Sequence, residues 1–192
     1  MIFKSARTFK VKTFALIILI FPFGYLHAAC NIILTHSDID YGIISPNSFH
    51  KSVKPWNLLP GRDTRVITFC SDSSTIVNEI SGAANKNGFL FGNSSQLKII
   101  AYNASMDGHP VLFGKVLASE PMILKSSGKK QIRIRNNDLI TPVSNDKPVT
   151  GKVFSMMLRI VPVLNGNDLK KTDEFDISSH ILITVQVKDL SQ

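Results

Sequence analysis

Stretches in which apolar and polar residues alternate recur along most of the chain, and this pattern constrains the fold more than any other feature. Successive side chains of a β-strand point to opposite faces, so alternation is typical of strands with one buried face. No stretch shows a convincing helical period. We therefore expect strands over residues 64–70, 97–102, 110–116, 131–135, 152–164 and 180–187, of which 152–164 is the longest.

Short turn signals separate the expected strands. Asp107-Gly108 lies between two of them and accepts the positive φ angles that tight hairpins require. Asn165-Gly166 turns the chain after the longest strand. The chain has 192 residues, of which 44% are apolar, and this suffices for one domain with a real core. Several short strands punctuated in this way predict a single all-β sandwich.

The start of the chain has the features of a secretory signal peptide. Its only charges are four basic residues, which are followed by an apolar run over 14–23 and by the small residues Ala28 and Ala29. The run is shorter than the ~20 residues that a spanning helix needs, and Pro22 interrupts its end. We expect a signal peptide over 1–29 and an exported domain over 30–192. An uncleaved anchor is the alternative.

The positive charge of the chain shrinks once this leader is removed. The full sequence carries 22 Lys and Arg against 14 Asp and Glu, and without the four leader charges 18 remain against 14, a net charge of +4. The densest basic cluster is Lys129, Lys130, Arg133 and Arg135, and its two arginines fall on one solvated face of an expected strand. So small and scattered an excess argues against a nucleic-acid partner.

The chain has two cysteines, Cys30 and Cys70. Export would place both in an oxidising compartment, where a disulfide between them is expected. Closing a loop of this length stabilises the fold by roughly 4 kcal/mol in the chain-entropy model. An alternative is a lipoprotein acylated on Cys30, but His27 stands where that signal requires leucine, and Cys70 would be left as a lone thiol.

The residues that usually carry catalysis form no recognisable pattern. The histidines at 36, 50, 109 and 180 are far apart and have no metal-ligand spacing, and two cysteines are too few for a cysteine-ligated zinc site. There is neither a G-x-S-x-G elbow nor a glycine-rich phosphate loop. We therefore expect a protein that is not an enzyme, with no catalytic residues, no metal site and no cofactor.

Taken together, several of these features resemble the subunits of bacterial chaperone–usher fimbriae. A signal peptide precedes Cys30, and Cys70 follows forty residues later at the end of a strand. Residues 80–103 look like the central region of such subunits, and Asp107-Gly108 looks like their usual hairpin. An apolar alternating strand lies near the C-terminus. The resemblance covers residues 30–188, and the cysteine spacing is its strongest element.

The resemblance implies an incomplete immunoglobulin-like sandwich that lacks its last strand. A periplasmic pilus chaperone would fill the resulting groove first, and the N-terminal strand of an adjacent fimbrial subunit would replace it at an outer-membrane usher, so that the protein reaches the cell surface in a fimbrium. The groove floor would be lined by the apolar face of the last strand, Ile181, Ile183, Val185 and Val187. Alternatively, these four side chains belong to the ordinary core of a complete sandwich.

The expected cleavage site bears on the position of such a subunit in its fibre. Cleavage after Ala28 or Ala29 leaves at most one residue before Cys30, so the chain would accept a strand without donating one and would sit at the distal tip. A tip position suggests adhesion to a host glycan or another surface receptor. Trp56, in the proline-rich loop 42–62, is a candidate for stacking on a sugar, or else packs over the sandwich end.

A second interpretation keeps the fold but changes the function. The chain would then be a self-complete periplasmic or surface binding domain, or a lipoprotein, with an immunoglobulin-like sandwich and an ordinary last strand. Stability in the absence of a chaperone distinguishes this interpretation from a fimbrial subunit.

Overall fold

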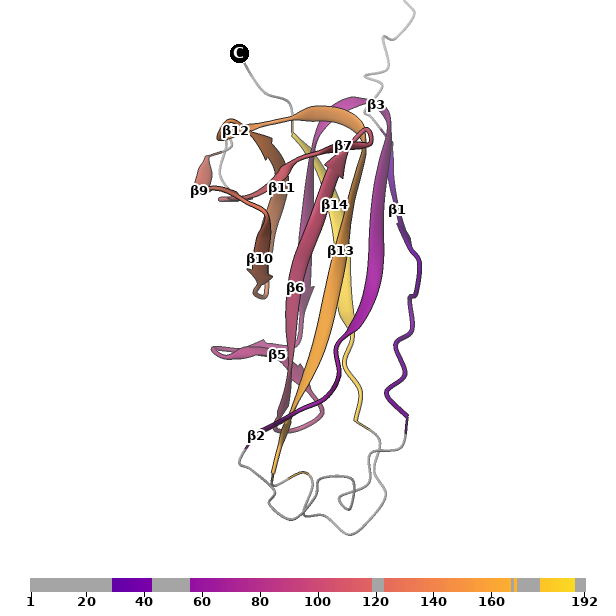
Figure 1. Ribbon diagram of the computed structural model, residues 1–192, viewed down its shortest axis with the longest axis vertical. Helices are drawn as coiled ribbons and strands as arrows, with labels where there is room; N and C mark the ends of the chain where they lie inside the picture. The colour runs from indigo at the N-terminus through magenta and orange to yellow at the C-terminus, as the bar shows by residue number, and fades with distance from the viewer. Residues whose placement is uncertain (1–28, 43–55, 119–122, 167, 169–176, 189–192) are drawn as a thin grey trace, which may run out of the picture.

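The computed structural model describes residues 29–42, 56–118, 123–166, 168 and 177–188. Nearly all of them lie in strands or in the turns between strands (Figure 1). In this part of the chain no helix has the length and apolar character needed to cross a membrane. The strands are β1 Cys30–Leu34, β2 Trp56–Leu58, β3 Arg62–Gly82, β4 Ala84–Asn85, β5 Gly88–Phe91, β6 Ser95–Met106, β7 His109–Pro110, β8 Leu112–Val116, β9 Leu124–Lys129, β10 Gln131–Ile134, β11 Asp138–Ser144, β12 Lys147–Pro148, β13 Thr150–Asn165 and β14 Ile181–Lys188.

The strands form one antiparallel ladder that is folded into two layers. Its order is β4-β5-β6-β13-β3-β11-β8-β9, and β3 joins the two halves. The first part of β3 pairs with β13, whereas its residues 78–80 pair with β11. Between these parts β3 arches over the end of the molecule (Figure 1). The expected all-β sandwich is therefore confirmed.

The sandwich interior is built from the inward positions of the alternating strands. In β13, Phe154 and Leu158 are 0% and 1% exposed, and in β6 Ile99 is completely buried. The neighbouring positions Lys152 and Arg159 are exposed. The alternating sequence of these strands thus places most of their apolar residues on the interior face, although Val153 of β13 is 39% exposed.

The expected hairpin at Asp107-Gly108 is confirmed. Both residues have positive φ, and Met106 pairs with His109 across them. The Asp107 carboxylate also accepts hydrogen bonds from the backbone N–H groups of Lys152 and Val153, at 3.0 and 2.8 Å. The turn therefore fixes the place where the ladder of β13 shifts register, between Gly151 and Val153.

The longest strand differs from the one expected. It is β3, with 21 residues, and the 16-residue β13 is second. Of β3, only residues 64–70 are predictable from alternation. The cause is the exposed polar run Ser71–Ser73 at the arch, which interrupts the alternation because these side chains point outward at the sandwich end.

The expected disulfide between Cys30 and Cys70 is present. It joins residues that face each other in the antiparallel pair of β1 and β3. The bond therefore fastens the first described strand to the body of the sandwich. The expected signal peptide lies outside the described residues except for Ala29.

Candidate functional site

Two strands, β1 and β14, form the layer edges on one side of the sandwich. Val66 of β3 pairs with Leu34 on one side and with Met156 of β13 on the other. Further along β3, Thr75 pairs with Lys188 on one side and with Thr150 of β13 on the other. Strands β1 and β14 thus follow one another along the same side of β3, and among the described strands each pairs with β3 alone.

The apolar face of β14 is only partly covered. Ile181, Ile183, Val185 and Val187 are half-buried and pack against the main core, whereas Leu182 is 60% exposed. The expected division of these residues between two faces is therefore confirmed. Their burial nevertheless falls short of that in the central strands, where the corresponding positions are completely enclosed.

Strand β1 repeats this incomplete burial. Ile32 and Leu34 are half-buried and pack against the same core, and Ile33 between them is 51% exposed. Two rows of partly exposed apolar side chains therefore line neighbouring edges of the two layers. We call this side of the sandwich, formed by β1 and β14, the open side.

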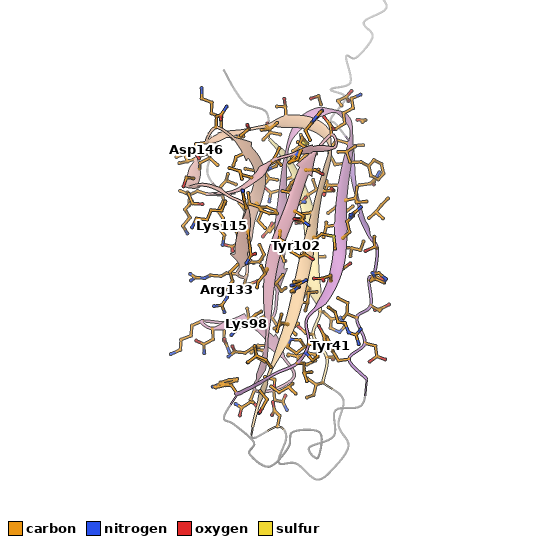
Figure 2. The ribbon with its side chains drawn as sticks, in the orientation of Figure 1. Tyr41, Lys98, Tyr102, Lys115, Arg133 and Asp146 are labelled. Atoms are coloured by element: carbon orange, nitrogen blue, oxygen red, sulfur yellow. A yellow bond between two sulfur atoms is a disulfide. The ribbon has the colours of Figure 1, made fainter. Side chains whose placement is uncertain are left out.

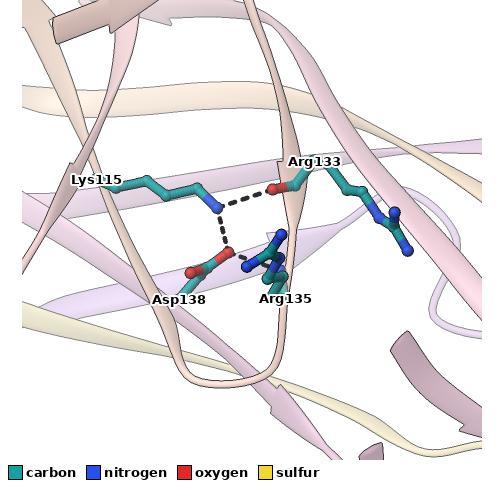
Figure 3. A network of polar contacts seen from close by, with 4 residues as sticks. All are labelled: Lys115, Arg133, Arg135 and Asp138. Atoms are coloured by element: carbon teal, nitrogen blue, oxygen red, sulfur yellow. Dashed lines mark hydrogen bonds and ion pairs between the residues drawn. The ribbon is translucent and has the colours of Figure 1, made fainter. Parts of the chain in front are cut away.

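The opposite side is closed by β10. This strand pairs with β6, and its Ile132 and Ile134 are 5% and 2% exposed. Lys115 of β8, in the other layer, donates a hydrogen bond of 2.8 Å to the carbonyl oxygen of Arg133. It also pairs with the carboxylate of Asp138 (Figure 3). We call this the closed side, because β10 pairs with β6 along the edge of one layer and Lys115 reaches it from the other layer.

A pocket of about 530 Å³ lies beside the closed side. Four cationic side chains line it, and Lys98 and Arg133 point to the same side of the molecule (Figure 2). Trp56 also lines the pocket and is 43% exposed. Trp56 begins strand β2, opposite Asn165 of β13, so its expected placement in a long loop is wrong. Pairing with β13 holds it at the pocket instead.

Part of this pocket was expected to be a solvated strand face, the one that carries Arg133 and Arg135. Arg133 and Arg135 are indeed exposed, but Lys86 and Lys98 lie in the same pocket although they are distant in sequence. Lys98 is the one charged residue of β6, and this was the only local signal. Lys98 and Arg133 line the same pocket because β6 pairs with β10, and the sequence does not reveal this pairing.

Among the described residues no group of three or more His, Cys, Asp or Glu side chains could hold a metal ion. His50, one of the four histidines that lack metal-ligand spacing in the sequence, lies outside these residues. The arrangement suits binding through backbone edges and through the basic pocket.

No protein-family model, curated protein or solved structure matches this chain.

Proposed function

We propose that the protein is a structural subunit of a chaperone–usher fimbria whose sandwich is completed by a strand from another protein. The observation that carries the proposal is the open side, where half-buried apolar rows on β1 and β14 border neighbouring sheet edges. On this proposal the sandwich is an incomplete immunoglobulin-like fold, and the space between the two edges is the acceptor groove.

The chemistry of the two edges supports strand addition. An incoming strand would form backbone hydrogen bonds along β14 and place alternate side chains against Ile181, Ile183, Val185 and Val187. Each of these residues is already partly in the core, so the added strand would remove their remaining exposed area from water. Filled edges also protect against edge-to-edge aggregation, which is a hazard for exposed apolar strands.

The proposed partners follow from this chemistry. A periplasmic chaperone supplies the strand first, and an adjacent subunit replaces it at an outer-membrane usher. Export through the periplasm agrees with the Cys30–Cys70 disulfide, which requires an oxidising compartment.

The position at the distal tip is the finer part of the proposal. It rests on the expected cleavage after Ala28 or Ala29 and on the tethering of Cys30 to Cys70 in the body of the domain. A donated strand of about ten residues would have to precede Cys30, because strands rise by ~3.3 Å per residue. N-terminal sequencing of the exported protein tests this: a mature start near residue 15 would contradict the tip position without affecting strand acceptance.

Two neighbouring residues of β14 provide a matched test of the groove. Ile183→Asp places a charge on the half-buried face, whereas Leu182→Asp places the same charge on the exposed face. We expect Ile183→Asp to abolish co-purification with a co-expressed periplasmic pilus chaperone and Leu182→Asp to retain it. Equal binding by both variants would contradict the groove.

Strand addition also has a direct effect on stability. A donor strand of the neighbouring subunit, fused after Gln192 through a flexible linker, should raise the midpoint of urea unfolding and slow amide exchange in β14. A self-complete sandwich would show neither change. This measurement does not depend on a substitution that could itself prevent folding.

A further inference from the structure

We propose that the pocket on the outer face of β6 binds an anionic saccharide, a sugar ring that carries a carboxylate or sulfate group. The pocket forms where β6 changes partner. Residues 95–97 pair with β5 and residues 99–102 pair with β10, so Lys98 lies at the break between the two partner strands. With a volume of about 530 Å³, the pocket falls within the range of small-molecule sites.

The lining of the pocket is strongly cationic. Lys86, Lys98, Arg133 and Arg135 all line it, and no acidic residue does. In the described part of the chain the ion pairs are Lys115–Asp138 and Arg159–Asp63, so none of these four cations is neutralised by an ion pair. One step beyond its last pair, the register of β10 and β6 sets Arg135 against Lys98. Like charges directly opposite each other on neighbouring strands are destabilising, and an anion bound between them would relieve the repulsion.

Internal contacts hold part of this positive charge in place. The guanidinium of Arg133 donates a hydrogen bond of 2.7 Å to the carbonyl oxygen of Asn87 in the β4–β5 turn. The backbone on either side is fixed by the bonds from Lys115 to the Arg133 carbonyl and from the Arg135 N–H to Asp138 (Figure 3). A fixed guanidinium retains donors for a carboxylate or sulfate and loses little entropy when it binds one.

The remaining lining suits a sugar ring. Trp56 is exposed and offers an apolar face on which the C–H groups of a pyranose can stack. The amides of Asn85 and Asn136 line the same pocket. Their oxygens accept hydrogen bonds from the backbone N–H groups of Gly88 and Gly82, so their NH₂ groups are the donors that they offer to sugar hydroxyls. One aromatic face beside several cations and amides matches one anionic sugar unit better than a row of stacked bases, which needs several aromatic platforms.

This site lies apart from β1 and β14, so the inference goes beyond strand acceptance and does not depend on it. The test measures binding of 3′-sialyllactose and of a heparin-derived tetrasaccharide to the full mature chain by calorimetry, with lactose as the neutral probe. We expect binding of at least one anionic probe and none of lactose. The two anionic probes distinguish a carboxylate-bearing sugar from a sulfated one.

Matched variants separate a built site from general charge attraction. We expect Lys98→Gln/Arg135→Gln to weaken binding by about tenfold or more, because two charge-assisted contacts are lost. Lys147→Gln/Lys152→Gln removes the same charge from exposed positions outside the pocket and should change binding little. Equal losses in the two double variants would overturn the proposal.

Trp56→Ala supplies the second criterion. We expect it to weaken saccharide binding but to leave the weak binding of inorganic polyphosphate unchanged, because polyphosphate has no ring to stack. Unchanged saccharide binding in Trp56→Ala, or no binding of either anionic saccharide to the native chain, would overturn the proposal. Chaperone binding measured on the same variants shows whether strand acceptance holds independently of this result.

Discussion

The open and closed sides of the sandwich are built from similar strands but enclose their apolar residues to different degrees. On the closed side, Ile132 of β10 is 5% exposed, and Lys115 connects the layers by bonding to the Arg133 carbonyl. On the open side, Ile183 of β14 and Ile32 of β1 remain half-buried. All three residues occupy inward positions of alternating strands. How far an inward side chain is buried therefore depends on what covers it at the edge of the two layers.

This difference connects the fold to the proposed function. A sandwich that closed both sides equally would offer no apolar edge to a partner strand. Here the disulfide holds β1 at the open side, while β14 depends on pairing with β3 and on its half-covered apolar face. The closed side needs no added strand to bury its apolar residues, and the surface pocket lies beside it. Four predictions test this contrast.

Removing the disulfide should have the largest effect. The chain-entropy model assigns roughly 4 kcal/mol to a loop of this size, and Cys30→Ser/Cys70→Ser should lower the free energy of unfolding by about that amount. Amide exchange should accelerate in β1 but remain slow in β10, because only β1 loses its tether. Equal acceleration in both strands would mean that the two sides unfold as one unit.

A matched pair of isoleucines compares the sides directly. Ile132→Ala should cost about 2–5 kcal/mol, because it leaves a cavity in an enclosed core. Ile183→Ala should cost less than half as much in the chain alone, since its side chain is already partly exposed. Urea unfolding of both variants measures the difference.

A donor strand that fills the open side should change the relative cost of the two substitutions. With a fused donor strand, the cost of Ile183→Ala should rise toward that of Ile132→Ala. If both substitutions lower the free energy of unfolding equally in the chain alone, the inward face of β14 is as enclosed as that of β10. This result would contradict the difference between the two sides.

The lysine bridge of the closed side should contribute less. Asp138 accepts hydrogen bonds from Lys115 and from the Arg135 N–H, and Asp138→Ala should cost about 1–3 kcal/mol. A double-mutant cycle with Lys115→Met isolates the coupling between the two side chains. Absence of coupling would show that backbone pairing of β10 alone closes this side.

The smallest effect is expected at the pair of Arg159 and Asp63, which lies on the outer face of the sheet between the two sides. Hydrogen bonding from Arg159 holds the pKa of Asp63 below its ordinary value of 3.8. Because the folded-state pKa is the lower one, the pair stabilises the fold above that ordinary value, and this contribution is lost as the pH falls through the lowered value.

Exposure limits the size of this contribution, since water and salt screen the pair. Unfolding of the native chain and of Asp63→Asn should therefore differ slightly at neutral pH and converge in strong acid. High salt should reduce the difference. A large difference that is insensitive to salt would contradict this assignment.

The sequence alone predicted six of the strands, at least in part, and one of the hairpins between them, but not β1, β9 or β11. Alternation in β10 and β14 fixed which side chains face inward, because a strand repeats every two residues and a sandwich has one interior. Asp107-Gly108 fixed a hairpin through its tolerance of positive φ. The two cysteines and the expected export predicted the disulfide.

Only the tertiary structure decided how far each inward face is buried and which cations meet. The second half of β3 could not be recognised locally, because the polar arch at Ser71–Ser73 interrupts its pattern. Ile132 and Ile183 look alike in sequence and both lie on paired strands, yet Ile132 is buried and Ile183 is only half-buried. Lys98 meets Arg133 because two strands share one edge of β6. Burial and charge clustering depend on contacts between residues that are distant along the chain, whereas alternation and turn geometry depend on neighbours within it.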